Sequence, residues 1–330
     1  MPLFSRKPRI PAQDQTTIFF ATDLHGSEVC FKKFVNAAAF YKADVLLLGG
    51  DITGKMVVPV VEDGAGRYRA RLHGQEHELH SESVEDFERR AWNAGLYTRR
   101  MTPDEHLHYA EHPEAVEGLF SEVVTRTVRR WVDYAHDRLK DTEVVIYNAP
   151  GNDDPAEVDA VLQEHGGDRF RFVEGEVVEI AKGHEMLSTG YTNHTPWNTH
   201  REYTEEQIAD RLQEMVGRLE NPSTALFNIH VPPHNSRIDS APMLDEDLVV
   251  QTSAGTQLTA PVGSTAVRTA LEEVQPLVSL HGHIHESGGA TKIGRTLAIN
   301  AGSEYGEGIL HGVLVTVGGG RLLRHQAVTG

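Results

Sequence analysis

Short apolar runs alternate with stretches of helical periodicity along most of the chain. The segment 16–22 is apolar and rich in strand formers, Ser27 can cap a helix that runs to about Lys42, and Val45-Leu46-Leu47-Leu48 follows. A continuous apolar run of this kind is typical of a strand covered on both faces. The start of the chain is therefore predicted to be a strand-helix-strand unit.

The same alternation returns after residue 140. Apolar runs predict strands at 144–147, near 170–180, and at 185–189, 225–229 and 277–280, and helices are expected at 204–219 and near 264–274. From Ala290 on, apolar segments separated by glycine turns predict antiparallel strands. Such alternation indicates an α/β protein.

The segment between these two parts has a different pattern. Residues 57–61 and 68–72 flank a glycine turn and predict an antiparallel hairpin, extended by 76–80, and two or three helices follow, the longest over 113–140. We interpret residues 55–140 as an inserted β-hairpin and helical cap. Residues 1–54 and 141–330 then form the main domain.

Polar residues that can bind metal ions follow five of the predicted strands. The motifs are Asp23-Leu24-His25, Gly50-Asp51, Gly151-Asn152-Asp153-Asp154, His230 and Gly282-His283-Ile284-His285. Each motif alone is weak, but a parallel sheet would bring all five to one edge. Oxygen and nitrogen donors of these types suit a pair of divalent cations, and paired cations are a device for hydrolysing phosphate esters. The pattern predicts phosphoester chemistry.

The ordered set resembles the calcineurin-like metallophosphoesterase superfamily, whose motifs run Asp-x-His, Gly-Asp, Gly-Asn-His-Asp or Glu, a single His and Gly-His-x-His. The resemblance covers roughly residues 16–54 and 142–317. It implies a four-layer αββα sandwich of two mixed β-sheets, which forms the catalytic domain and carries the inserted hairpin-plus-helices cap.

The resemblance also implies a set of metal ligands. Carried over by motif, Asp23, His25 and His285 would hold one ion and Asn152, His230 and His283 the other, while Asp51 would bridge both. The ions would be Mn²⁺, Fe²⁺/Fe³⁺ or Zn²⁺. In the family a hydroxide between the two metals attacks phosphorus, so Asp51 and Asn152 count as catalytic residues as well. His281, one position before Gly282, makes the register ambiguous and would be a core or supporting histidine.

One position departs from the family pattern. Asp153 stands where the family has a histidine that is thought to assist the leaving group, and an ionised Asp would repel a phosphate. We therefore expect another residue in that role or a substrate with a good leaving group. His194 and His234 are the candidate replacements, although each is also compatible with an ordinary loop histidine. The loop containing Trp197 is expected either to line a substrate cleft or simply to pack.

The charge composition of the chain limits the classes of partner that it is expected to bind. The chain has 31 Lys plus Arg against 48 Asp plus Glu, a formal net charge of −17, which argues against nucleic acid and anionic membranes as partners. Local basic surfaces, from Arg67, Arg69 and Arg71 or from Arg99, Arg100, Arg126, Arg129 and Arg130, could still face the cleft.

Cysteine content and hydropathy indicate the cellular compartment that we expect for the protein. The single cysteine, Cys30, excludes an intrachain disulfide. The start of the chain has Arg6, Lys7 and Arg9 but no apolar run typical of a signal peptide, and no stretch approaches the length of a membrane span. We expect a cytoplasmic protein.

The favoured function is that of a metal-dependent phosphodiesterase acting on a small, possibly nucleotide, phosphoester. A phosphomonoesterase or nuclease of the same superfamily is one alternative, and a catalytically inactive scaffold or binding protein with this fold is another. Asp51 is followed by Ile52-Thr53-Gly54-Lys55, which lacks the Asp and Arg of the protein phosphatase branch. That branch is set aside.

Overall fold

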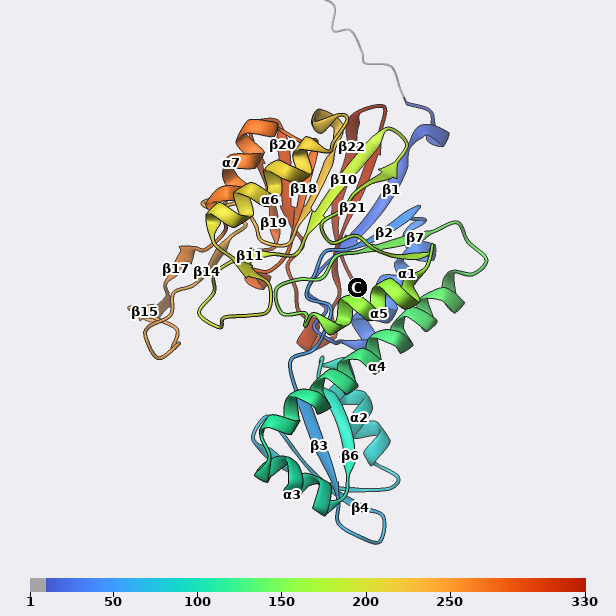
Figure 1. The fold of residues 1–330 in the computed structure, drawn as a ribbon, viewed down its shortest axis with the longest axis vertical. Coiled ribbons are helices and arrows are strands. Elements are labelled where there is room, and N and C mark those ends of the chain that lie inside the picture. Colours follow the sequence, from blue (N-terminus) through green and yellow to red (C-terminus); the bar gives the residue numbers. More distant parts are fainter. Residues whose placement is uncertain (1–9) are drawn as a thin grey trace, which may run out of the picture.

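Two six-stranded sheets pack face to face in the main body of the molecule, which is the upper part of Figure 1. The computed structural model describes residues 10–330, so Arg6, Lys7 and Arg9 lie outside the described residues. In order across the first sheet, the strands are β22 (Arg321–Thr329), β21 (His311–Gly318), β1 (Thr16–Ala21), β2 (Val45–Leu48), β7 (Val145–Asn148) and β8 (Phe170–Phe172). The second sheet runs β19 (Gly289–Ile293), β20 (Thr296–Asn300), β18 (Val278–His281), β13 (Leu226–Ile229), β10 (His184–Thr189) and β9 (Val177–Ala181).

Both sheets are mixed. In the first, β1, β2, β7 and β8 are parallel, while β21 and β22 add antiparallel strands beside β1. In the second, β20, β18, β13 and β10 are parallel, and β19 and β9 are antiparallel edge strands. The predicted antiparallel tail is therefore only partly correct, because β20 continues the parallel part of its sheet.

Helices cover the outer face of each sheet. On the first sheet lie α1 (Glu28–Tyr41), α4 (Glu114–Leu139) and α5 (Glu157–Gly166), and on the second lie α6 (Glu205–Gly217) and α7 (Thr265–Val274). The apolar side chains between the two sheets, including Phe20, Leu47, Leu226 and Leu280, form a separate cluster. These layers confirm the predicted αββα sandwich.

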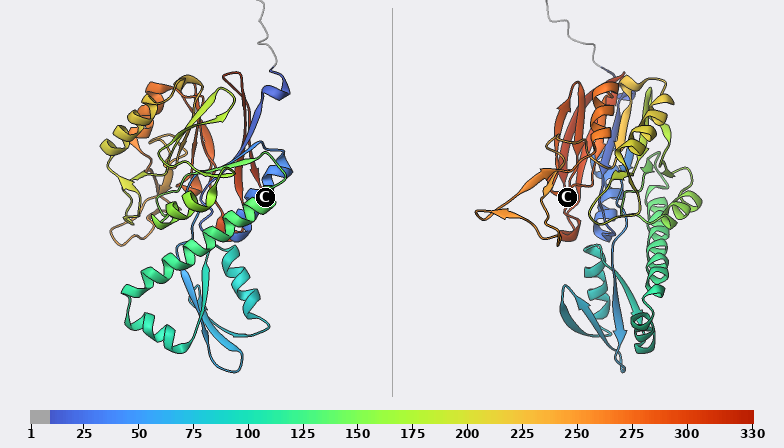
Figure 2. Two further views of the ribbon diagram at one scale, coloured as in Figure 1. Left: turned by 45° about the vertical axis from the view of Figure 1, so that its right-hand side comes forward. Right: turned by 60° about the vertical axis from the view of Figure 1, so that its left-hand side comes forward.

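The segment after β2 forms its own four-stranded sheet beyond the main body (Figures 1 and 2). Its strands are β3 (Val57–Glu62), β4 (Arg67–Leu72), β5 (Gln75–His80) and β6 (Tyr97–Met101), with helices α2 (Val84–Asn93) and α3 (Pro103–Glu111). The parallel pairing of β6 with β3 was not predicted. The helix α4 leads back from this segment to the main body, where Trp131 stacks on Phe31 of α1 at 4.2 Å. The assignment of this segment as a cap stays a prediction.

A small hairpin projects from the second sheet near the strand ends (Figure 2). It consists of β14 (Ser240–Pro242), β15 (Thr252–Ser253), β16 (Thr256–Gln257) and β17 (Thr259–Pro261). Nearby, β11 (Thr192–Asn193) pairs with β12 (Glu202–Tyr203) and closes the loop between them. Short 3-10 helices are η1 (Ala12–Asp14), η2 (Pro222–Thr224), η3 (His285–Ser287) and η4 (Tyr305–Glu307).

Two observations concern the expected compartment. None of the helices within residues 10–330 combines the length and the apolarity needed to cross a bilayer. Cys30 is a free cysteine in α1 and is buried.

Candidate metal centre

The five motifs lie at the carboxyl ends of strands from both sheets. Asp23, Asp51 and Asn152 follow β1, β2 and β7 of the first sheet, whereas His230 follows β13 and the histidines of Gly282-His283-Ile284-His285 follow β18 of the second. The motifs are shared between the two sheets of the expected sandwich and are not carried by one parallel sheet. The site forms where the carboxyl ends of two packed sheets meet.

Asp23, His25 and His285 form one cluster of potential ligands. The His285 Nε2 lies 3.3 Å from Asp23 Oδ1, and the His25 Nε2 lies 3.9 Å from the same oxygen. The two imidazole nitrogens His25 Nε2 and His285 Nε2 are 3.0 Å apart. Their donor atoms surround a common point, as the ligands of one ion would.

Asp51, His230 and His283 form a second cluster, in which their ligand atoms all lie within 4.8 Å of one another. The His230 Nε2 is 3.3 Å from Asp51 Oδ2, and His25 Nε2 of the first cluster is 3.6 Å from the same oxygen. Asp51 thus lies between the two clusters. Among the described residues, every group of histidines and carboxylates close enough to hold an ion belongs to this site, and the histidines of the insertion form none.

Buried ligand atoms without hydrogen-bond partners indicate that the site fits metal ions. The His230 Nδ1 lies 2.9 Å from the carbonyl oxygen of Gly49, which makes Nδ1 the donor and leaves Nε2, which has no hydrogen-bond partner, facing Asp51 as the atom available to a metal ion. The amide of Asn152 donates through Nδ2 to Thr199 Oγ1 at 2.9 Å, while its buried Oδ1 has no partner. Unpaired buried acceptors are costly, and a cation would satisfy them.

The backbone is strained at several of these side chains. Asp23, His25, Asp51 and His283 have φ values of 53°, 41°, 48° and 67°, in the left-handed region that residues other than glycine seldom adopt. Such conformations persist where the surroundings enforce them, and they concentrate at functional sites. Gly151 has a related role, because a Cβ at that position would collide with the Asp51 carboxylate.

The electrostatics of the site show an excess of buried negative charge. Burial tends to raise the pKa of Asp51, but the nearby charge of His230 outweighs burial and holds that pKa well below its usual range. Burial tends to lower the pKa of His230, but the charges of Asp51 and Asp23 outweigh it and raise the pKa to about 10. Without another cation, a histidine must carry the compensating charge, and bound metal ions would take over that role.

Asp153 lies beside these clusters and is paired with Lys55. Its carboxylate forms an ion pair with the Lys55 ammonium, and its Oδ2 lies 3.9 Å from His25 Nδ1. Burial and the neighbouring charge of Asp51 raise the pKa of Asp153 to about 6, although Lys55 acts in the opposite direction. The sequence interpretation gave Lys55 no role. Its position four residues after Asp51 was the available signal.

The sequence interpretation also gave Asp154 no role. The side chain is fully buried and accepts hydrogen bonds from Ile52 N at 3.1 Å, Thr53 N and Gly151 N at 2.8 Å, and Thr53 Oγ1 at 2.7 Å. Asp154 therefore fixes the Gly50-Asp51 turn against the Gly151-Asn152 turn. The tandem Asp153-Asp154 was the signal, but only the structure separates a residue that faces the cleft from one that holds the backbone.

The other histidines named from the sequence occupy different places. His194 is largely exposed in the loop after β11, with Nδ1 3.4 Å from Glu202 Oε2, and it lines the cleft described below. His234 hydrogen-bonds through its backbone NH to Ser264 and is not among the cleft residues. His281 is buried outside the ligand clusters, with Nδ1 2.8 Å from the carbonyl oxygen of Ile229.

A cleft of about 1100 Å³ opens onto the ligand clusters. Its floor includes Asp51, Asn152, Asp153, His283 and His285, and Lys55 is the one Lys or Arg among its lining residues. The arginines of the insertion that were considered as a basic surface do not line it.

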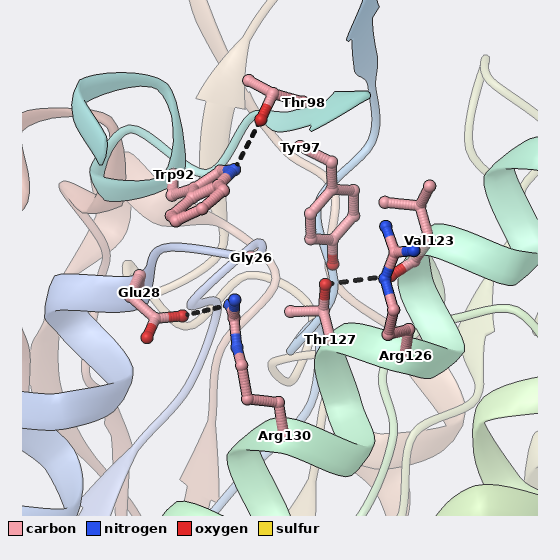
Figure 3. A pocket seen from close by; sticks show the side chains of 9 residues that line it. All are labelled: Gly26, Glu28, Trp92, Tyr97, Thr98, Val123, Arg126, Thr127 and Arg130. Carbon is pink, nitrogen blue, oxygen red and sulfur yellow. Dashed lines mark hydrogen bonds and ion pairs between the residues drawn. The ribbon is translucent and has the colours of Figure 1, made fainter. Parts of the chain in front are cut away.

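Two of those arginines line a separate hollow of about 120 Å³ between α1, β6 and α4 (Figure 3). Arg130 donates to Glu28 at 2.7 Å and lies over the Trp92 ring, and Arg126 is 3.4 Å from Glu122. The acidic partners neutralise this hollow, so it is not a basic extension of the metal centre.

Known proteins resemble this chain over less than half of its length in sequence, but over nearly all of its length in fold. No family model matches the chain. The uncharacterized protein MJ1162 of Methanocaldococcus jannaschii is 32% identical over 154 residues, which cover 46% of this chain and 61% of that protein. The match thus spans about three fifths of the curated relative.

One solved structure superposes with a TM-score of 0.52 at 16% identity, covering 96% of this chain and 98% of the other. That likeness extends over nearly the whole of both chains and concerns the fold. A dimetal phosphatase from Danio rerio gives a TM-score of 0.43 at 10% identity, covering 95% of this chain and 98% of its own.

Proposed function

We propose that this metallophosphoesterase-like protein is a metal-dependent phosphoesterase, most active on phosphodiesters. The observation that carries the proposal is the position of Asp51, whose carboxylate lies 3.3 Å from His230 Nε2 and 3.6 Å from His25 Nε2. A carboxylate between two clusters of donors suits a bridging ligand of two divalent cations.

Each cluster supplies one set of ligands. Asp23, His25 and His285 would hold one ion, Asn152, His230 and His283 would hold the other, and Asp51 would contact both. When bound, the ions supply Lewis acidity, a lowered pKa for bound water and neutralisation of phosphoryl oxygens. Mixed carboxylate, amide and imidazole ligands are compatible with Mn²⁺, iron or Zn²⁺.

Residues around the clusters would position the substrate. Lys55 brings a half-exposed ammonium to the cleft, where it can attract an anionic phosphoester while pairing with Asp153. The ion pair compensates the charge of the Asp153 carboxylate, which reduces the repulsion of a phosphate expected from Asp153 alone. Because Asp153 is held in this ion pair, it gives little help to a departing alcohol, so substrates with good leaving groups are favoured. Phosphodiesters of aryl or similar alcohols have such leaving groups.

The first experiment tests metal dependence with a chromogenic diester. The protein is stripped of metal and assayed with bis(p-nitrophenyl) phosphate, with and without Mn²⁺, Zn²⁺ or Fe²⁺, and metal content is measured in parallel. We expect activity that appears with metal and disappears in Asp51→Asn. Retention of the metal without turnover on any ester would instead support a binding protein with this fold.

A further inference from the structure

The cleft has an apolar wall as well as its metal-binding floor. The wall consists of two segments, the loop after β11 and the projecting hairpin, and its apolar residues are Pro196, Trp197, Met243, Leu244, Val250 and Val262. Trp197 is 63% exposed and Val250 is 44% exposed. Soluble proteins seldom leave large apolar side chains gathered in this way unless they contact a ligand or partner.

The large exposed apolar side chains of the molecule are concentrated in this region. Seven of the eleven within residues 10–330 lie on the loop or the hairpin: Trp197, Met243, Leu248, Val249, Val250, Leu258 and Val262. Four of these seven also line the cleft. The apolar surface is therefore continuous with the cavity that contains the candidate metal ligands.

The wall is fixed relative to the ligands by hydrogen bonds. Ser287 Oγ, two residues after His285, donates to the carbonyl oxygen of Ser240 at the start of the hairpin, at 2.6 Å. Asn193 Nδ2 donates to the carbonyl oxygen of Val262 at 3.2 Å and so joins the loop to the hairpin. The apolar wall and the metal-binding floor thus belong to one connected site.

Two threonines of the loop are already engaged with Glu202. Thr195 Oγ1 and Thr199 Oγ1 donate to Glu202 Oε1 at 2.6 Å and 2.7 Å, and Thr195 N donates to Glu202 Oε2 at 3.1 Å. These groups are used to hold the loop, so they are poorly placed to recognise the hydrogen-bonding edge of a base or sugar. Apolar contact with Trp197 and the hairpin residues then supplies recognition along this wall.

We propose that the substrate is a phosphoester that carries a bulky apolar group, such as an alkyl chain, and that this group lies along the wall formed by Trp197, Met243, Leu244 and Val250. This inference rests on the proposed phosphoesterase function and names the substrate class of the same site. The phosphate would lie at the floor near Lys55, and the apolar group would extend toward the hairpin. The cleft, at about 1100 Å³, has room for both.

The test uses p-nitrophenyl alkyl phosphates with methyl, butyl and octyl groups, below their critical micelle concentrations. The leaving group is constant in this series, so kcat/KM reports only the retained alkyl group. Burying a methylene group fully is worth up to about fourfold, and for a partly open wall we expect about twofold per methylene, on the order of 100-fold from methyl to octyl. The thymidine p-nitrophenyl phosphate diester is compared in parallel.

Variants locate the effect on the hairpin. Val250→Ser and Met243→Ser should reduce the octyl-to-methyl ratio of kcat/KM by about fivefold or more, because each removes apolar contact from the wall. The matched control is Leu258→Ser, since Leu258 is exposed on the same hairpin but does not line the cleft. The control should keep the wild-type ratio.

The outcomes separate the substrate class from the reaction. Turnover of all esters with a flat chain-length profile, or a preference for the thymidine ester over the octyl ester, would overturn the inference and leave the phosphoesterase standing. If no ester is hydrolysed, the proposed function fails, and octylphosphonic acid binding decides the inference separately. Saturable quenching of Trp197 fluorescence by octylphosphonic acid but not methylphosphonic acid, lost in Trp197→Phe, supports the apolar site, and its absence refutes it.

Discussion

At the scale of single residues, the site combines ligands under strain with side chains that hold them in place. Four candidate ligands have positive φ values, and Asp154 holds the turns that carry Asp51 and Asn152 through four hydrogen bonds. The ligand and positioning roles can be separated experimentally, because they should affect turnover and stability differently.

His283→Ala tests the ligand role and the register of the last motif. His283 is half-buried and belongs to the second cluster, so its removal should reduce metal-dependent turnover by several orders of magnitude with little change in the circular dichroism spectrum. The same change at His281, which lies outside the clusters, should leave metal content near that of the wild type. Activity near wild type in His283→Ala would show that the register is wrong.

Asp154→Asn tests the positioning role. In the variant, the NH2 group of the asparagine would point at a backbone NH, so two donors would face each other. We therefore expect the free energy of unfolding, measured by urea titration, to fall by on the order of 3 kcal/mol. Asp137→Asn is the control, since Asp137 is exposed and pairs only with Lys140 on a helix surface. Equal stabilities of the two variants would contradict the role assigned to Asp154.

Asp153→His tests the departure from the family pattern. A histidine facing the phosphate can protonate a poor leaving group, so we expect at least tenfold faster hydrolysis of alkyl leaving groups and a smaller change for p-nitrophenyl. Asp153→Asn separates the loss of negative charge from the gain of an acid. An Asp153→His enzyme with unchanged rates on both substrates would show that residue 153 does not face the phosphate.

At the scale of elements, the loop between β11 and β12 depends on one carboxylate. Burial tends to raise the pKa of Glu202, but hydrogen bonds from Thr195 and Thr199 outweigh burial and lower the pKa to about 2 from the usual 4.5. A lowered pKa in the folded state means that Glu202 stabilises the loop fully above pH 4.5. That contribution is lost as the pH falls toward 2.

The loop can be followed through Trp197, which lies between its two threonines. In wild type, Trp197 fluorescence should change between about pH 4.5 and 2 as Glu202 is protonated. In Glu202→Gln the loop should already be altered at neutral pH, and this acid transition should be absent. Trp197→Phe gives the background from the other tryptophans. An unchanged acid transition in Glu202→Gln would assign it to another group.

The elements of the two sheets were largely predictable from sequence because their apolar runs are continuous and buried on both faces. Val45-Leu46-Leu47-Leu48 is β2, and the long helix expected over 113–140 is α4 (Glu114–Leu139). The projecting hairpin and the pairing of β6 were not predictable, since Thr252–Gln257 is exposed and Tyr97–Met101 includes two arginines. Short strands stabilised by local pairing have weak periodicity.

Within the site, residue types were more predictable than geometry. The motifs identified which side chains come together, but the sequence did not show that two sheets share them. The apolar wall also had little signal, because Met243, Leu244 and Val250 are separated by polar residues and gather only when the hairpin folds.

At the scale of the whole molecule, ligands from both sheets link metal binding to stability. Metal ions bound only by the folded protein should stabilise it by about 2.7 kcal/mol at a free concentration of 100 times Kd. We expect the thermal midpoint of the stripped protein to rise with added Mn²⁺ and to rise much less in Asp51→Asn. A metal-dependent rise of equal size in both proteins would place the binding elsewhere.

The pairing of β1 with β21 joins the two ends of the described chain, since Thr16 lies opposite Val317. During synthesis, the strand that leads to Asp23 must wait until residues 311–318 have been made before it gains this neighbour. Loss of β21 and β22 would leave β1 as an open edge, free to pair with other chains. A ribosome that stalls late would therefore release an aggregation-prone product whose first catalytic motif is present but unsupported.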